Sequence, residues 1–160
     1  MPAAPVLPPA QDGIAIIGIS LRVPGAPDRD AFWRNLEGGV ESVGEIPPER
    51  WNAEAWYDAD LSAPGKSNSK WGGFLRDIDQ FEPLFFHLSP KDAAAMDPQQ
   101  RLCLMESWRA LEDAGYAPDS LAGRAVGVYV GAREPEYPVL AARQGQPANA
   151  GLIRGGDMSL

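Results

Sequence analysis

The two side chains best suited to nucleophilic chemistry are Cys103 and His87, the only cysteine and the only histidine in the chain. A thiol beside an imidazole could form a nucleophile–base pair. Cys103, however, is predicted to lie in the middle of a helix between Leu102 and Leu104, where neither a helix N-terminus nor a cation would activate the thiol. We therefore expect Cys103 to be buried by core packing and His87 to be a surface or turn-flanking residue.

A second polar group, D-P-Q-Q-R at residues 97–101, has the composition of a catalytic cluster. Asp97 precedes a proline and is pushed out of the α region, so it can cap a helix that starts with that proline. A glutamine three residues after the cap fits a capping box. We expect Arg101 to make a structural ion pair or hydrogen bond, with Glu106 or Asp92 as its partner. These local roles account for the cluster without catalysis.

The usual cofactor and metal motifs are missing from the sequence. Gly18-Ile19-Ser20 follows a predicted strand, but it lacks the second glycine that lets a backbone approach a pyrophosphate. Neither a phosphate-binding G-x-x-x-x-G-K-S/T loop nor a G-x-S-x-G nucleophile elbow occurs. One histidine and one cysteine cannot assemble the usual zinc site. We predict that the chain binds no cofactor directly and no metal.

Residues 89–115 are predicted to form two helices end to end. Ser89 can cap the first helix, which closes at Met96 because a proline follows shortly. The second helix runs from Pro98 to the left-handed stop supplied by Gly115. Its apolar side chains share one face: Leu104, Trp108 and Leu111.

Two segments are predicted to be core strands. Residues 14–19 form a continuous apolar run with four isoleucines, which is typical of a strand buried on both faces. Residues 125–131 alternate valine with other residues in strand fashion. A helix that carries Phe32, Trp33 and Leu36 is predicted, capped by Asp28 or Asp30 and ended by Gly38-Gly39. Because two strands do not make an independently stable sheet, we predict that the chain is part of a larger domain and marginally folded alone.

From residue 40 to residue 73 the periodicity is poor, apart from a short helix predicted after Asn52. A long irregular excursion of this kind is typical of a functional surface loop. The alternative is that its large rings anchor the loop to the body by burial, which we favour for each ring taken singly. These rings are Trp51, Trp56, Tyr57 and Trp71.

The bulk composition is that of an ordinary globular domain, with 160 residues, 44% hydrophobic and 22% charged. A net charge of −8 argues against nucleic acid or an anionic membrane surface as a partner. No apolar run approaches the roughly 20 residues of a membrane helix. The Pro/Ala-rich leader, residues 1–12, lacks the basic and apolar regions of a secretory signal. Together with the single cysteine, these features predict a cytoplasmic protein.

The order of short motifs along the chain resembles the β-ketoacyl synthase domain of modular polyketide synthases. D-P-Q-Q-R-L at residues 97–102, followed by A-L-E-D-A-G, is the most specific part. The colinear matches are I-A-I-I-G (14–18), R-V-P-G (22–25), A-F-W-R-N-L (31–36), E-R-W-N-A-E-A-W-Y (49–57), K-W-G-G-F-L (70–75), F-E-P-L-F-F-H-L-S-P (81–90) and G-V-Y-V-G (127–131). Val23 stands where the family has an aromatic residue, and His87 where it more often has Gly or Asn. The resemblance covers residues 13–160.

The resemblance implies an α/β, thiolase-like fold, of which residues 13–160 would be the N-terminal part of a layered αβαβα ketosynthase domain. The family performs decarboxylative Claisen condensation, in which a cysteine takes an acyl chain and two histidines promote decarboxylation of a malonyl-type extender. Its motifs D-T-A-C-S-S-S-L, E-A-H-G-T-G-T and N-x-G-H do not occur here. We therefore expect no catalytic residue in this chain. Asp157 is expected to cap a further helix. We therefore expect the DNA past Leu160 to encode a D-T-A-C-S-S-like motif.

The implied partners are an acyl carrier protein, whose phosphopantetheine carries the substrates, and other synthase domains. The parent would be a homodimer. Two alternatives stay open. The chain could be a non-catalytic interaction module that pairs with a synthase subunit or carrier protein through the 40–75 loop, or a new enzyme that uses Cys103.

Overall fold

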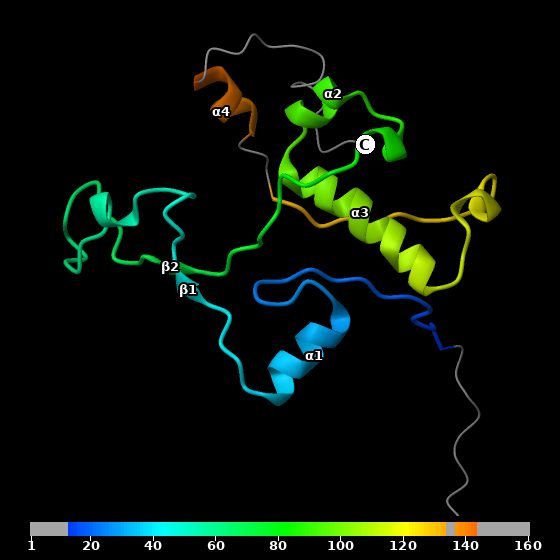
Figure 1. Cartoon of the computed structure of the whole chain (residues 1–160), viewed down its shortest axis with the longest axis horizontal. Coiled ribbons are helices and arrows are strands. Elements are labelled where there is room, and N and C mark those ends of the chain that lie inside the picture. Colours follow the sequence, from blue (N-terminus) through cyan, green and yellow to red (C-terminus); the bar gives the residue numbers. More distant parts are fainter. Residues whose placement is uncertain (1–12, 134–136, 144–160) are drawn as a thin grey trace, which may run out of the picture.

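The computed structural model describes residues 13–133 and 137–143 (Figure 1). The predicted leader and the predicted cap at Asp157 lie outside the described residues. The α-helices are α1 (Arg29–Glu37), α2 (Pro90–Ala95), α3 (Pro98–Asp113) and α4 (Tyr137–Arg143). The strands are β1 (Gly44–Glu45) and β2 (Trp71–Gly72), and the 3₁₀ helices are η1 (Ala53–Ala55), η2 (Leu84–Phe86) and η3 (Pro118–Leu121).

Helix α1 begins at a local side-chain cap. The Asp28 Oδ1 atom accepts a hydrogen bond from the backbone N of Ala31 at 2.7 Å, so Asp28, and not Asp30, is the cap. The chain leaves the helix through Gly39, whose φ of +59° is left-handed. The predicted helix is thus confirmed, together with its glycine end.

Helices α2 and α3 meet at the predicted break. The Ser89 hydroxyl caps α2 by accepting from the backbone N of Asp92 at 3.1 Å. Met96 is extended, with a ψ of 140°, so α2 ends there. After α3, Gly115 takes a φ of +72° and turns the chain back.

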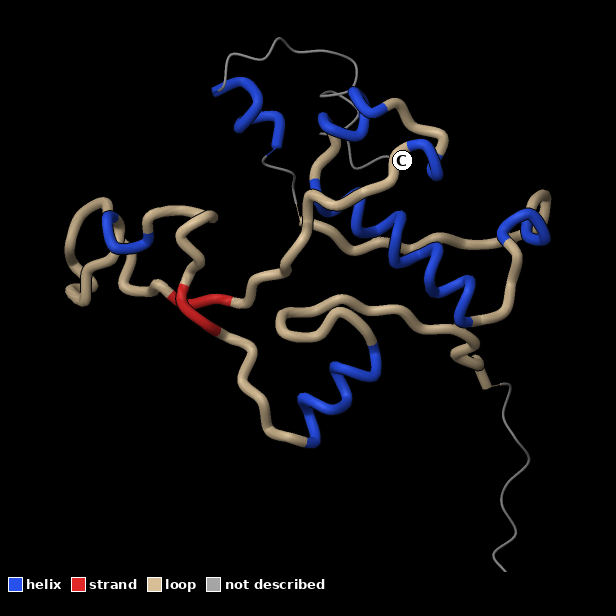
Figure 2. Tube along the Cα trace, in the orientation of Figure 1, coloured by secondary structure: helices blue, strands red, loops and turns tan. Residues whose placement is uncertain are grey.

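The two predicted core strands are extended but are not strands, which corrects the prediction. Residues 14–19 and 125–131 carry no ladder within the described chain, and Figure 2 draws both as irregular backbone. A strand exists only through hydrogen bonds to a neighbour. Here no neighbour supplies them among the described residues.

The sheet of the described chain lies where no strand was predicted. Strands β1 and β2 pair antiparallel, with Gly44 opposite Gly72 and Glu45 opposite Trp71. This two-rung ladder closes the base of the long loop. Its short length explains why no period-2 pattern marks it in the sequence.

Both extended segments lie along α3 and run against its direction (Figure 1). Ile19 contacts Asp113 at the end of α3, and the next residue, Ser20, contacts Glu106 nearly two turns earlier. The second segment reaches the start of α3 only at Arg133, through Gln99. The two segments are therefore parallel to each other, as in a βαβ unit.

Few apolar side chains are enclosed. Within residues 13–133 and 137–143, the buried apolar residues are Ala26 and Ala93. On the extended segments, Ile14 is 99% exposed and Val128 is 82% exposed. The low burial is the physical ground for expecting marginal stability of the isolated chain.

An aromatic cluster lies between η2 and α3. Phe81 stacks on Phe86 with ring centres 5.0 Å apart. Phe85 meets the Trp108 ring edge-on at 4.6 Å. Trp108 belongs to the predicted apolar face of α3, so that face holds η2 against the helix.

Candidate functional site

The junction of α2 and α3 gathers the buried polar side chains of the described chain: Asp97, Gln100 and Arg101. Asp97 Oδ1 accepts from the backbone N of Gln99 at 2.8 Å and from its Nε2 at 3.3 Å. The carboxylate therefore serves as the cap of α3, as predicted. Asp97 is therefore held by its own helix.

Gln99 links the start of α3 to the second extended segment. Its Oε1 accepts from the backbone N of Arg133 at 3.1 Å, and its Nε2 donates to the backbone O of Arg133 at 3.3 Å. A carboxamide that takes both backbone groups of one residue imitates a strand partner. Sequence reasoning missed this role, because the two residues are 34 positions apart.

Arg101 does not pair with either predicted carboxylate. Glu106 accepts from Arg109 at 2.7 Å and from the Ser20 hydroxyl, and Asp92 accepts from Ser89 at 2.7 Å. Arg101 is only 8% exposed, and its Nε is enclosed without a hydrogen-bond partner. The prediction of an ion pair or hydrogen bond with Glu106 or Asp92 was wrong, since these carboxylates accept from other donors.

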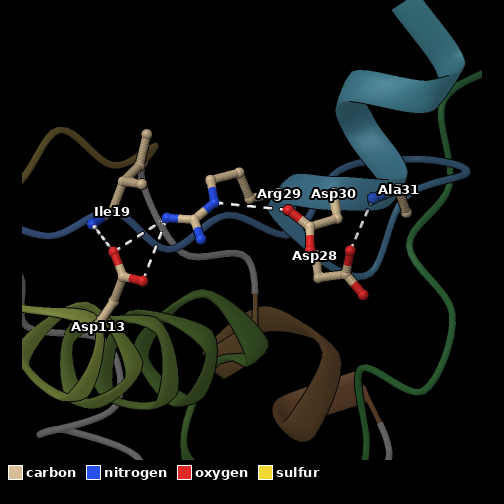
Figure 3. A network of polar contacts seen from close by, with 6 residues as sticks. All are labelled: Ile19, Asp28, Arg29, Asp30, Ala31 and Asp113. Atoms are coloured by element: carbon tan, nitrogen blue, oxygen red, sulfur yellow. Dashed lines mark hydrogen bonds and ion pairs between the residues drawn. The ribbon is translucent and has the colours of Figure 1, made fainter.

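A polar network ties the first extended segment to α1 and α3 (Figure 3). Asp113 Oδ2 accepts from the backbone N of Ile19 at 2.9 Å, and both its oxygens lie 3.1 Å from Arg29 Nη1. Figure 3 shows Arg29 between Asp113 and Asp30. The network borders a cleft of about 400 Å³ that is also lined by Glu106.

The hydrogen bond from Ile19 and the charge of Arg29 lower the pKa of Asp113. A carboxyl whose pKa is lower in the folded state stabilises it above the unfolded pKa of about 3.9, and that stability is lost as pH falls further. We expect the urea midpoint for loss of far-UV helix signal to fall between pH 5 and pH 3. Asp113→Asn should make the urea midpoint depend less on pH in this range. An equal pH dependence in the wild type and the variant would contradict the assigned role of Asp113.

The structure does not join the candidate nucleophile and base. Cys103 lies inside α3, away from its N-terminus, and is partly exposed instead of buried as predicted. The exposed His87 ends η2, so its prediction as a turn-flanking surface residue is confirmed. No hydrogen bond connects the two among the residues described.

His87 takes a left-handed conformation, with φ 56° and ψ 29°. A Cβ in this region costs about 1–2 kcal/mol, while glycine adds unfolded-chain entropy of roughly 0.5–1 kcal/mol. We expect His87→Gly to stabilise the chain by about 0.5–1 kcal/mol in urea unfolding followed by far-UV circular dichroism. His87→Ala keeps the Cβ and should give no gain. A gain from alanine equal to that from glycine would exclude backbone strain as the cause.

The long loop forms an excursion at residues 51–71, which is held together mainly by its own contacts. Lys70 Nζ lies 3.0 Å from Glu54 and 3.2 Å from Glu45, and 5.2 Å from the centre of the Tyr57 ring. The two glutamates raise the pKa of Lys70. Trp51, Trp56 and Trp71 are 56%, 60% and 49% exposed. The prediction that these indoles are anchored by burial was therefore wrong.

A second cleft, of about 1280 Å³, opens between residues 22–27, 42–50 and 72–79. Two arginines hold its wall by donating to backbone carbonyls. Arg22 Nη2 bonds the O atom of Arg76, and Arg50 Nη2 bonds the O atom of Leu75 at 2.6 Å. In both arginines the Nη2 atom therefore holds the backbone of the cleft wall in place.

Within the described ranges, no group of three or more His, Cys, Asp or Glu residues is placed to hold a metal ion. In the same ranges, no helix has the length and apolar character needed to span a bilayer.

Comparison with known protein families assigns the chain to a family. Residues 11–158 match the N-terminal domain of β-ketoacyl synthases. The chain belongs to the β-ketoacyl synthase family. The ketosynthase segment is 44% identical over 155 residues to polyketide synthase ThaG of Burkholderia thailandensis. It is 46% identical over 138 residues to polyketide synthase PksL of Bacillus subtilis.

Solved ketosynthase structures superpose on the segment. The oxazolomycin ketosynthase domain OzmH KS7 of Streptomyces albus gives a TM-score of 0.73 at 40% identity, over 82% of this chain and 24% of that one. The ketosynthase from module 6 of the bacillaene synthase of Bacillus subtilis gives 0.59 at 41% identity, over 67% of this chain and 18% of that one. The expected thiolase-like α/β fold is confirmed, in part of its length.

The ketosynthase segment spans only 3% of ThaG, with 96% of its own length aligned, and 3% of PksL, with 82% aligned. The similarity therefore concerns one part of one domain within much larger synthases.

Proposed function

We propose that this chain forms the N-terminal part of a ketosynthase domain in a polyketide synthase, and that the whole domain performs decarboxylative Claisen condensation. The family match over residues 11–158 carries the proposal. The two parallel extended segments beside α3 support it, because their exposed apolar side chains fit strands of a larger sheet.

In the proposed reaction, a cysteine thiolate of the whole domain takes an acyl group as a thioester. A malonyl-type extender then loses CO₂, and its carbanion attacks the acyl carbonyl. The new carbon–carbon bond forms as the carbon–sulfur bond to the enzyme breaks, which restores the thiolate. The motifs that carry the nucleophile and both histidines of this scheme do not occur in this chain, so the chain alone is inactive. It contributes framework to the whole domain, through α3, its polar junction with α2 and the first extended segment.

The proposal implies carrier-protein substrates on phosphopantetheine, contact with other synthase domains, a homodimeric parent and a cytoplasmic location. No nucleic acid or membrane has a part in it. The net charge of −8 is in keeping with that partner set.

A chimera tests the proposal directly. Residues 13–160 would replace the matching part of the bacillaene module 6 ketosynthase, to which they are 41% identical over the superposed region. We expect the chimera to take an acyl group from a carrier-protein thioester, seen by intact mass spectrometry. A chimera with the host cysteine changed to serine is the control. A soluble, folded chimera that never acquires the acyl mass would contradict the proposal.

A second candidate function, an interaction module, is favoured by the excursion at residues 51–71. Its indoles are half exposed although the loop is closed by its own contacts. In a pull-down, the whole chain should then retain a synthase subunit or carrier protein. Changing Trp51, Trp56 and Trp71 together to alanine should abolish this retention. Equal retention by both forms would exclude this function for the excursion.

A further inference from the structure

The feature that the ketosynthase framework leaves unexplained is the guanidinium of Arg101. It is 8% exposed, its Nε is enclosed without a hydrogen-bond partner, and no ion pair reaches it from the described residues. An arginine keeps its charge in any protein environment. A buried charge without a partner strongly disfavours the folded state, so such a group normally has a partner in the finished structure.

The acidic side chains close to Arg101 along α3 are already engaged. Asp97, one turn before Arg101, accepts twice from Gln99. Glu106 pairs with Arg109. The residue one turn after Arg101 on the same face is Met105, which brings no charge. The helix itself therefore leaves the guanidinium without a counter-charge.

Other arginines of the chain show what a neutral partner can do. Arg22 and Arg50 donate to backbone carbonyls, yet both keep contact with solvent, which compensates their charge. Arg101 has far less of that solvent, since it is 8% exposed and its Nε is enclosed, and carbonyl groups would not neutralise its charge. A carboxylate satisfies both requirements, because it is anionic and matches the two-pronged geometry of a guanidinium.

We propose that Arg101 is a binding position for the carboxylate of an Asp or Glu side chain carried by the remainder of the ketosynthase domain. The inference rests on the proposed function for the source of that side chain. A side chain fits better than a free acid, since neither of the two clefts is lined by Arg101. A partner that packs over the α2–α3 junction would complete the polar cluster with Asp97 and Gln100.

The first test uses the full 160-residue chain and amide hydrogen exchange of residues 98–113 at constant pH. Arg101→Met removes the unpaired charge and keeps the volume, so exchange should slow by about tenfold or more. Met105→Glu supplies a carboxylate on the same face and should also slow exchange, but adding it to Arg101→Met should slow exchange no further than Arg101→Met alone. Arg109→Met removes an exposed arginine and is the matched control, with little change. Faster exchange in Arg101→Met would overturn the proposal.

The second test places the same change in the ketosynthase chimera, where the partner is present. Arg101→Met should now lower the rate of acylation or of refolding by about tenfold or more. The rate for Arg101→Lys should lie between those of the unchanged chimera and Arg101→Met. Equal rates with and without Arg101 in a working chimera would overturn the inference alone. Failure of the chimera that retains Arg101 would instead count against the proposed function. If acetate or malonate at about 50 mM slows exchange in the free chain only when Arg101 is present, a diffusible acid is the ligand, and the proposed side-chain source is wrong.

Discussion

Incubated with an acyl thioester, the isolated chain is expected to gain no mass. Its one thiol, Cys103, lies within α3, where it has no helix N-terminus beside it, and no base is hydrogen-bonded to it among the described residues. Transfer to a thiol that is neither activated nor oriented should be negligible on the time scale at which a ketosynthase is fully acylated. Intact mass spectrometry measures the outcome directly.

Iodoacetamide provides the control, because Cys103 is partly exposed and should be alkylated slowly by this small reagent. The absence of an acyl adduct would then show that the Cys103 thiol is not activated, since the thiol would be known to be accessible. A stoichiometric acyl adduct that disappears in Cys103→Ser would contradict the expectation. It would favour an enzyme that uses Cys103 as its nucleophile.

Gly18→Val is expected to detach the first extended segment from α3. A Cβ at Gly18 would meet the backbone O of Ala110 and would lie 2.8 Å from the Cβ of Ala114. A helix carbonyl cannot move aside as a flexible side chain can, so the segment itself must move. Overpacking of this kind costs roughly 3 kcal/mol. It would also break the hydrogen bond from Ile19 to Asp113.

The measurement is hydrogen exchange of residues 13–22 and 105–113, which should both become faster in Gly18→Val. Gly131→Ala is the matched control. It also lies in an extended segment, but its added Cβ meets no atom within 4 Å. If the valine variant exchanges as the wild type does, the close contact with α3 is not what holds the segment.

The family and the helix boundaries could be predicted because their causes are local. Asp28, Ser89 and Asp97 each cap a helix whose accepted N–H lies two or three residues away. The break at Met96 follows from a proline two residues on. The colinear motifs that resemble ketosynthases are likewise properties of the chain order, and the family match confirms them.

The candidate site was less predictable, because its contacts join distant residues. Gln99 binds the backbone of Arg133, 34 positions away, and Ile19 binds Asp113, 94 positions away. The carboxylates expected to pair with Arg101 accept from other donors instead, such as Arg109, and its Nε has no partner. The exposure of the three indoles also depended on where the excursion at residues 51–71 stands in space.

The sequence by itself determined helices α1, α2 and α3, their caps, the glycines that end α1 and α3, and the family, since each depends on residues within one turn or on motif order. Only the tertiary structure decided that residues 14–19 and 125–131 are extended segments without ladders, because a strand is defined by its neighbour and not by its own residues. It also decided that Gly18 is a packing contact against α3 and that the Nε atom of Arg101 is enclosed without a hydrogen-bond partner. Burial and pairing are set by which segments meet, and that is a property of the fold.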